Sequence, residues 1–220
     1  MTNLNQLILN FEYKQNFKDE DFYVSKSNYF AFNLITSWPK WEKNFLNICG
    51  DNFSGKSHLS NIFLKKFKGI KINAHSFKNE HLREIKAHEN IVLENFDLNI
   101  NEILIYSLFN TIDQDNKYLV INSTIPINEI NFKLGDLKSR TKNCLVAKID
   151  KPDDDLMFAL ILKNFSDRQI TIDKKLIDFI IKRIDRSYDK IFEFIYKIDE
   201  LSLKKKKPID FKTIKEVLKA

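Results

Sequence analysis

The sequence predicts an α/β protein in which a five-stranded parallel sheet, flanked by helices, precedes a small all-helical lid. Short and mostly unalternating apolar runs, typical of strands buried on both faces, alternate with helical stretches up to about residue 150. From residue 153 onward every apolar pattern is helical. We therefore divide the chain into an N-terminal arm (1–15), a nucleotide-binding αβα domain (16–152) and a helical lid domain (153–220).

The predicted strands are short apolar runs at 45–49, 70–72, 91–93, 118–121 and 145–147. Between them, apolar residues recur at helical spacing over 57–67 and 101–112. Beyond the sheet, helices are expected over 153–162, 171–184, 187–201 and 208–218. The run of Asp153, Asp154 and Asp155 suits a helix start, because carboxylates cap the first turn and favour the positive end of the helix dipole.

Composition narrows the class of protein. A hydrophobic content of 43% over 220 residues is enough for a core, and four Gly and four Pro favour long regular elements. The net charge of +6 is compatible with binding near nucleic acid, but a solvated Lys-rich surface explains the charge equally well. No apolar run is long enough to span a bilayer and no secretory signal opens the chain, so we expect a cytoplasmic protein without membrane contact. Cys49, Cys144 and the four His lack metal-ligand spacing, and no protein-ligated metal is expected.

A complete phosphate-binding loop lies between the first strand and the helix that follows: Gly50-Asp51-Asn52-Phe53-Ser54-Gly55-Lys56-Ser57. The glycines let backbone N–H groups point at phosphate oxygens, and Lys56 reaches the β and γ phosphates. The Ser57 hydroxyl can join the coordination of Mg²⁺, and the neighbouring His58 is a further candidate contact. A chance Gly-Lys-Ser turn is the alternative, but the full pattern between a strand and a helix argues against it.

The strand at 91–93 runs into Glu94-Asn95-Phe96-Asp97, where a nucleotide hydrolase places its acids. Glu94 can act on Mg²⁺, directly or through water. Asn95 occupies the position of the carboxylate base, and a neutral amide cannot take a proton. We therefore predict strong nucleotide binding with slow or no hydrolysis, unless a shifted strand register lets Asp97 take over.

These residues, read in order, resemble the DnaA/Hda family of AAA+ ATPases, and within it the short Hda type. The resemblance covers nearly the whole chain. The segment 21–28, with Tyr23, Val24 and Asn28, is similar to the box that packs around adenine. Asn122 falls at the first sensor, Arg140 at the arginine finger, and Lys190 at the second sensor, where DnaA carries Arg. Lys keeps the charge but loses the bidentate fork, which weakens the expectation of γ-phosphate sensing.

Two features are similar to the Hda type rather than to DnaA itself. Gln6-Leu7-Ile8-Leu9-Asn10-Phe11 resembles a sliding-clamp-binding peptide, in which Gln6, Leu7, Leu9 and Phe11 would make the contacts. Taken alone, such a hexapeptide also occurs in ordinary strands. The sequence ends at Ala220, directly after the predicted lid, so the origin-binding domain of DnaA is expected to be absent.

The resemblance implies a regulatory inactivator of DnaA. Such a protein binds ADP or ATP with Mg²⁺, docks on the DNA-loaded sliding clamp (the β subunit of the polymerase) and promotes hydrolysis of DnaA-bound ATP. Arg140 would act in trans, and replication would not be initiated repeatedly. The expected partners are DnaA, the clamp and the DNA that threads it, and a homo-oligomer is left open. The alternatives are a clamp- and nucleotide-binding adaptor that leaves DnaA hydrolysis unchanged, a self-contained ATPase, and a helper that places DnaA at the origin.

For two groups of side chains, a purely structural or solvated role is the alternative to a functional one. Without the resemblance, Arg140 would be expected to cap a helix or pair with an acid of its own chain. The run from Lys204 to Lys207 is expected to be a solvated loop rather than a DNA-binding patch.

Overall fold

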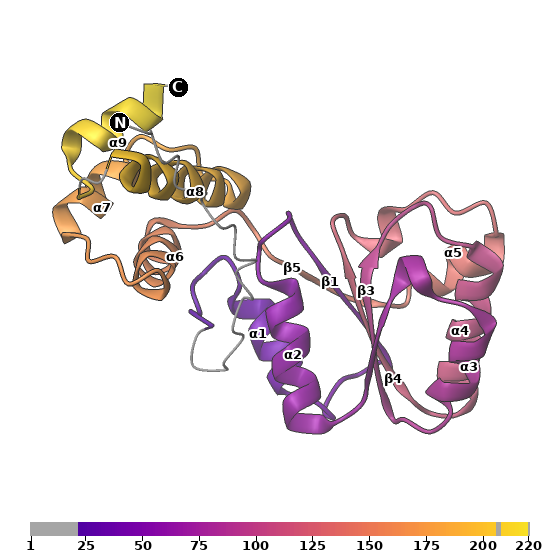
Figure 1. Cartoon of the computed structure of the whole chain (residues 1–220). Helices are drawn as coiled ribbons and strands as arrows, with labels where there is room; N and C mark the ends of the chain where they lie inside the picture. The colour runs from indigo at the N-terminus through magenta and orange to yellow at the C-terminus, as the bar shows by residue number, and fades with distance from the viewer. Residues whose placement is uncertain (1–21, 206–207, 220) are drawn as a thin grey trace, which may run out of the picture.

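The computed structural model describes residues 22–205 and 208–219. Its centre is an all-parallel sheet of five strands in the order β2-β3-β4-β1-β5 (Figure 1). The strands are β1 (Phe45–Cys49), β2 (Ile70–Asn73), β3 (Asn90–Phe96), β4 (Tyr118–Ser123) and β5 (Leu145–Lys148). The predicted five-stranded parallel sheet with helices on both faces is confirmed.

Helices cover both faces of the sheet. α1 (Tyr29–Thr36) and α2 (Lys56–Phe67) lie on one face, and α3 (Asn79–Ile85), α4 (Glu102–Gln114) and α5 (Gly135–Thr141) lie on the other (Figure 1). Two 3₁₀ turns, η2 (Ala74–Ser76) and η3 (Ile127–Glu129), follow β2 and β4. α2 and α4 match the predicted helices, whereas α1, α3 and α5 were not predicted, because at seven or eight residues each shows too little periodicity.

β1 is an interior strand of the sheet, and the phosphate-binding loop follows it. All five of its residues are buried, because β1 lies between β4 and β5 and apolar cores cover both faces of the sheet. Its one polar residue, Asn47, is fully satisfied in the interior: its amide donates to the Ile121 carbonyl (2.9 Å) and the Ser123 hydroxyl (2.8 Å). The Asn47 oxygen accepts from the Ile127 N–H (2.9 Å). A buried amide without partners would be costly, so this residue fixes the end of β4 and the turn beyond it.

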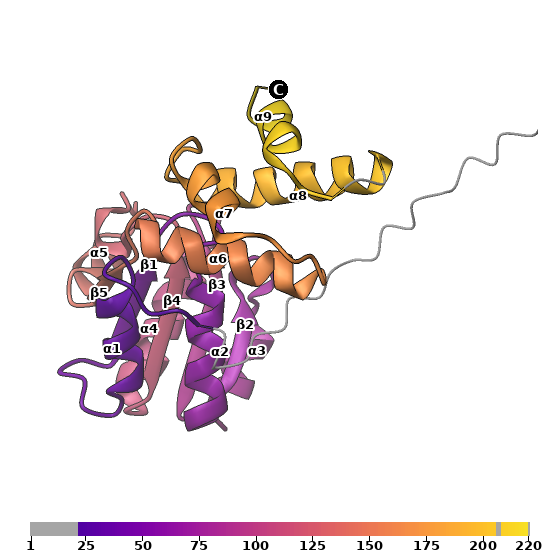
Figure 2. The same cartoon turned by 90° about the vertical axis from the view of Figure 1, so that its left-hand side faces the viewer.

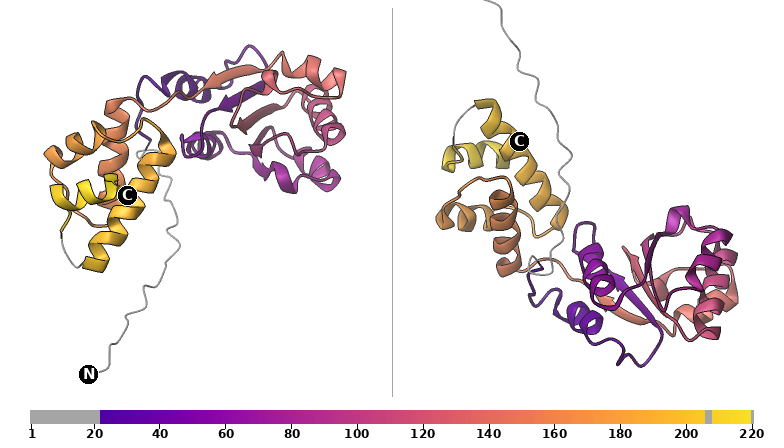
Figure 3. Two further views of the ribbon diagram at one scale, coloured as in Figure 1. Left: turned by 90° about the horizontal axis from the view of Figure 1, so that it is seen from above. Right: turned by 60° about the horizontal axis from the view of Figure 1, so that its bottom comes forward.

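Four helices follow the sheet: α6 (Asp154–Asp167), α7 (Lys174–Ile181), α8 (Tyr188–Lys205) and α9 (Phe211–Lys219). As predicted, an Asp caps α6, because the Asp153 carboxylate accepts from the Leu156 N–H (2.8 Å). These helices, called the lid below, share an apolar core that includes Met157, Ile161, Phe165 and Ile195. They gather at one end of the molecule, beside α1 and α2 (Figures 1, 2 and 3).

The lid meets the sheet domain through the start of α6 and α8. Leu156 and Tyr188 pack into the core between the sheet and α2. The Tyr188 hydroxyl donates to the Asp150 carbonyl (3.0 Å), on the segment that leads from β5 into the lid. Within the described ranges, no helix combines the length and apolar character that a membrane crossing requires.

Candidate nucleotide-binding site

The loop between β1 and α2 has the backbone of a phosphate cradle. A Cβ atom at residue 50 would lie 2.9 Å from the Ile149 carbonyl oxygen, so only glycine lets the loop pass this close to the end of β5. Gly55 has φ +97 and begins α2 in a left-handed conformation that other residues rarely adopt. The loop therefore delivers the first N–H groups of α2, which suit an anion, to the carboxyl edge of the sheet.

Lys56 is held back against this loop. Its Nζ donates to the Gly50 carbonyl (2.7 Å) and the Asp51 carbonyl (2.6 Å). Burial lowers the pKa of the Lys56 ammonium, and the nearby Asp51 and Glu94 carboxylates oppose that effect. A partly desolvated cation beside a row of N–H groups offers a strong site for phosphate oxygens.

Ser57 and Glu94 form the centre of a buried polar network. The Ser57 hydroxyl donates to Glu94 Oε2 (2.9 Å), and the Asn122 amide donates to the same oxygen (3.0 Å) and to Ser60 Oγ (2.7 Å). Glu94 Oε1 and Asn122 Oδ1 are buried without a hydrogen-bond partner among the described residues. These oxygens are thus available to accept further hydrogen bonds or to act as ligands, and oxygen ligands suit Mg²⁺.

Ser57 and Glu94 therefore fit a magnesium ion that arrives with a nucleotide. When bound, Mg²⁺ would neutralise charge on the phosphates. The described residues contain no cluster of three or more His, Cys, Asp or Glu side chains that could hold a metal ion without that help.

A bulge in β3 decides where the side chains after Glu94 point. Leu93 pairs with Ile121 and Phe96 with Ser123, so β3 carries one residue more than β4 over this stretch. Asn95 adopts φ +57 and is exposed, whereas Glu94 and Phe96 on either side are buried. Asn95 thus faces the cavity described next, and Asp97 follows on the same rim.

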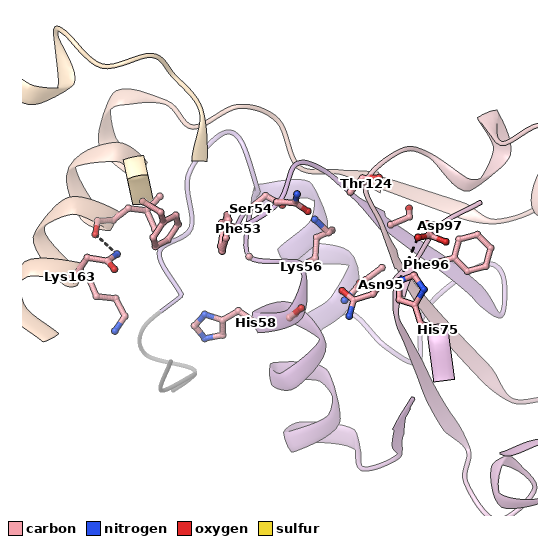
Figure 4. Close-up of a pocket in the computed structure, with 18 of the residues that line it drawn as sticks. Phe53, Ser54, Lys56, His58, His75, Asn95, Phe96, Asp97, Thr124 and Lys163 are labelled. Atoms are coloured by element: carbon pink, nitrogen blue, oxygen red, sulfur yellow. Dashed lines mark hydrogen bonds and ion pairs between the residues drawn. The ribbon is translucent and has the colours of Figure 1, made fainter. Parts of the chain in front are cut away.

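A cavity of ≈ 520 Å³ joins the phosphate loop to the lid (Figure 4). That volume is typical of small-ligand sites. Its floor is the loop from Asn52 to His58, with residues from the carboxyl ends of the strands on one side: His75, Asn95, Asp97, Asn122, Ser123 and Thr124. The lid supplies the opposite wall, from α6 and α8: Leu160, Lys163, Asn164, Asp167 and Phe192.

The lid contacts the loop through an aromatic pair. Phe53, which has φ +60, lies with its ring centroid 5.1 Å from that of Phe192. Lys190, the predicted second sensor, is not among the described residues that line the cavity. Its Nζ pairs with Glu193 (2.8 Å), and hydrogen bonds from Lys190 and Lys197 lower the pKa of the Glu193 carboxyl to about 2. Among the described lid residues, Lys163 of α6 is the lysine that lines the cavity.

The predicted adenine box is divided between two places. Asn28 is buried and holds its own turn, donating to the Tyr23 carbonyl (2.9 Å) and accepting from the Ser25 N–H (2.9 Å). Tyr23 and Val24 are exposed and line a separate hollow beside the start of α6. His58 lines the main cavity, where the ring of Phe22 meets it edge-on at 5.3 Å.

Arg140 lies on α5, on the face of the sheet that α1 and α2 do not cover (Figure 1). It pairs with Asp113 of α4, and its guanidinium lies 5.4 Å from the centroid of the Tyr106 ring. Its side chain is 34% exposed, and it is not among the described residues that line the cavity.

The other predicted interaction segments lie wholly or partly outside the described residues. The clamp-binding residues 6–11 are outside them. Of the C-terminal lysine run, Lys204 and Lys205 are described, and they pair with Glu200 (2.5 Å) and Glu216 (2.6 Å) of the lid.

Sequence reasoning missed His75, Thr124, Lys163 and Phe192 as cavity residues. His75 and Thr124 follow the ends of β2 and β4, and the carboxyl ends of parallel strands are where α/β proteins bind ligands, so a signal for them existed. Lys163 and Phe192 carried no such signal, because their placement depends on how the lid sits against the loop.

The five parallel strands, the order of the sheet and the phosphate loop after β1 define a P-loop α/β fold. The chain superposes on domain III of the replication initiation protein DnaA from Thermotoga maritima with a TM-score of 0.72 and 20% identity, covering 92% of this chain and 95% of that one. A replication initiator DnaA bound to AMPPCP and single-stranded DNA gives a TM-score of 0.67 at 20% identity, covering 85% of this chain and 67% of that one.

Sequence comparison leads to the same proteins. The chain is 26% identical, over 226 aligned positions, to the chromosomal replication initiator protein DnaA of Thermoanaerobacter sp. (strain X514). The alignment covers 91% of this chain and 51% of DnaA, so the chain spans about half the length of the curated relatives it matches. No family model matches it. The chain is thus similar to DnaA in sequence, and it shares the fold of DnaA domain III.

Proposed function

We propose that this chain binds ADP or ATP with Mg²⁺ and acts on DnaA as an Hda-type regulator. The nucleotide would lie in the cavity, with its phosphates on the loop from Gly50 to Ser57 and its Mg²⁺ between Ser57 and Glu94. The unpartnered Glu94 Oε1 and the desolvated Lys56 support this placement. The AMPPCP named for the related DnaA structure supports the class of ligand.

The observation that carries the regulatory role is the placement of Arg140. Arg140 lies on α5, is not among the described residues that line the chain's own cavity, and is part-exposed. An arginine in such a position can stabilise charge on a transferring phosphoryl group only in a neighbouring molecule. We propose that this neighbour is ATP-bound DnaA, and that residues 6–11 bring the two together on the DNA-loaded clamp. The neutral Asn95 supports a chain whose own nucleotide serves mainly as a structural ligand.

Hydrolysis of DnaA-bound ATP, measured with and without DNA-loaded clamp, tests this proposal. We expect this chain to stimulate hydrolysis only when the clamp is loaded. Arg140→Ala should lower the stimulated rate at least tenfold, since an arginine finger contributes about 10³–10⁵ to such rates. A chain lacking residues 6–11 should fail in the same way.

The pair of Arg140 with Asp113 provides a matched control. Asp113→Asn breaks the intramolecular ion pair but leaves the guanidinium, so it should keep the stimulation if Arg140 acts in trans. Loss of stimulation in both variants, with clamp binding preserved, would return Arg140 to a structural role. Clamp binding without any stimulation by the unaltered chain would favour the adaptor function.

A further inference from the structure

A His–Asp pair lies on the rim of the cavity, close to the position where the expected carboxylate is missing. His75 Nε2 lies 3.5 Å from Asp97 Oδ2, and the two side chains are 53% and 37% exposed. In Figure 4 they face each other beside Asn95, on the far side of Asn95 from Lys56. Both residues line the cavity together with Lys56 and Ser57.

Two adjacent strands bring this pair together. β2 and β3 are parallel neighbours, with Asn73 opposite Glu94. The Asn73 side chain caps the turn after β2 by accepting from the His75 N–H (3.0 Å). On the other strand, the bulge at Asn95 changes the phase of the chain. The Asp97 carboxylate then accepts from the Asn99 N–H (2.8 Å), which fixes its position after the strand ends.

We propose that His75, oriented by Asp97, is the proton acceptor for slow hydrolysis of ATP bound in this cavity, in place of the absent carboxylate at residue 95. The proposal rests on the nucleotide site proposed above. A carboxylate beside Nε2 stabilises the tautomer that carries its proton there, which leaves the Nδ1 lone pair to accept another. Asn95 can hold a water molecule by hydrogen bonds but cannot take its proton.

The step balances without a further reactant. His75 takes one proton from a water molecule while the water oxygen bonds to the terminal phosphorus. The bond from that phosphorus to the bridging oxygen breaks, and ADP and inorganic phosphate are the products. The Asp97 carboxylate stabilises the imidazolium, and the exposed ring returns its proton to solvent. Asp97 is a positioning residue in this scheme, because it acts through His75.

Other charged groups share the cavity with this pair. Lys56 and His58 come from the loop and α2, and Lys163 and Asp167 come from the lid. Lys56 would stabilise charge on the terminal phosphate, whereas His58 lies on the lid side of Lys56 (Figure 4). His75 is therefore the histidine placed on the same side of the cavity as the ends of β3 and β4, where the network around Glu94 would hold the Mg²⁺.

Single-turnover hydrolysis tests the proposal, with the full chain in excess over labelled Mg·ATP. We expect slow hydrolysis by the unaltered chain and about a 100-fold lower rate constant in His75→Ala, the size of a lost general base. Added imidazole should restore part of the rate in His75→Ala. His88→Ala, at a histidine that is not among the described residues lining the cavity, is the matched control and should behave as the unaltered chain.

Asp97 needs a measurement that separates positioning from folding. Asp97→Asn should lower the single-turnover rate constant about tenfold while the dissociation constant for a fluorescent ADP analogue stays the same. Asp97→Glu should recover part of the rate. Equal loss in both variants, or weaker nucleotide binding in either, would contradict the positioning role.

NMR gives a result that is independent of activity. The ring resonances of His75, assigned by their loss in His75→Ala, should shift more with AMPPCP than with ADP, because the proposal places the ring beside the terminal phosphate. Equal shifts with both nucleotides would overturn the proposal, as would full hydrolysis by His75→Ala or no hydrolysis by a chain that binds ATP. If the fluorescent ADP analogue does not bind at all, the nucleotide site itself fails and the proposed function fails with it.

Discussion

The sheet domain and the lid hold their two walls of the cavity in different ways. On the sheet side, Glu94 and Asn122 sit at the ends of paired strands, and their positions follow from the hydrogen-bond ladder. On the lid side, Lys163 and Phe192 are carried by helices with a core of their own. The position of the sheet-side wall is therefore set by strand pairing. The opposite wall depends on a smaller interface, formed by Leu156, Tyr188 and the ring contact of Phe53 with Phe192.

A matched pair of core truncations tests this division most strongly. Phe109 of α4 and Phe165 of α6 are both fully buried, one in each half. Each Phe→Ala change should cost about 3–5 kcal/mol of local stability. Phe109→Ala should reduce hydrogen-exchange protection in the strands and weaken ADP binding, whereas Phe165→Ala should reduce protection in α6 to α9 first. Loss of protection across both halves in Phe165→Ala would show that they unfold as one unit.

Tyr188→Phe probes the interface itself, with a smaller effect. The change removes the part-buried hydrogen bond to the Asp150 carbonyl, and we expect a loss of about 1–2 kcal/mol in chemical denaturation at neutral pH.

The same tyrosine gives the interface a pH dependence. Burial raises the pKa of the Tyr188 phenol above its ordinary value. The folded chain therefore favours the protonated phenol, so this contribution is complete below about pH 10, the ordinary tyrosine pKa, and is lost as the pH rises above it. The stability difference between Tyr188→Phe and the unaltered chain should shrink above about pH 10. A constant difference would mean that the phenol is not buried at this interface in solution.

Phe192→Ala has the smallest expected effect on stability, about 1 kcal/mol, because Phe192 is only half-buried and loses one aromatic contact. It should nevertheless increase the freedom of the lid relative to the loop, since Phe53 is its partner. Distances between a label on α8 and one on α2, measured by electron paramagnetic resonance, should broaden in this variant. Lys190→Ala, at a lid residue paired with Glu193, is the control and should leave the distribution unchanged.

The sequence was sufficient for the sheet, because strands buried on both faces appear as apolar runs and the five runs fall within two or three residues of the strand ends. The short helices α1, α3 and α5 were missed. Packing against the sheet stabilises them, and each is too short to show a clear helical pattern in the sequence. The phosphate loop could be predicted because its residues are contiguous. The pairing of His75 with Asp97 could not be predicted. It depends on the adjacency of β2 and β3 and on a bulge in β3 that has no recognisable sequence pattern.

The lid residues show the same limit. Lys190 falls at the predicted sensor by position along its helix, but its side chain pairs with Glu193 while Lys163 of another helix lines the cavity. Which helix face meets the loop is set by tertiary packing, and a motif read along one helix contains no information about it.

The backbone of Asn95 also constrains how this position can vary among natural sequences. At φ +57 a β-branched or aromatic side chain is strained, whereas Asn, Asp and Gly are tolerated. The requirement to fold therefore favours a short polar residue or glycine at this position, whether or not the residue takes part in hydrolysis. An Asn or Asp at this position in relatives is therefore explained by the backbone conformation alone and does not by itself indicate a catalytic role.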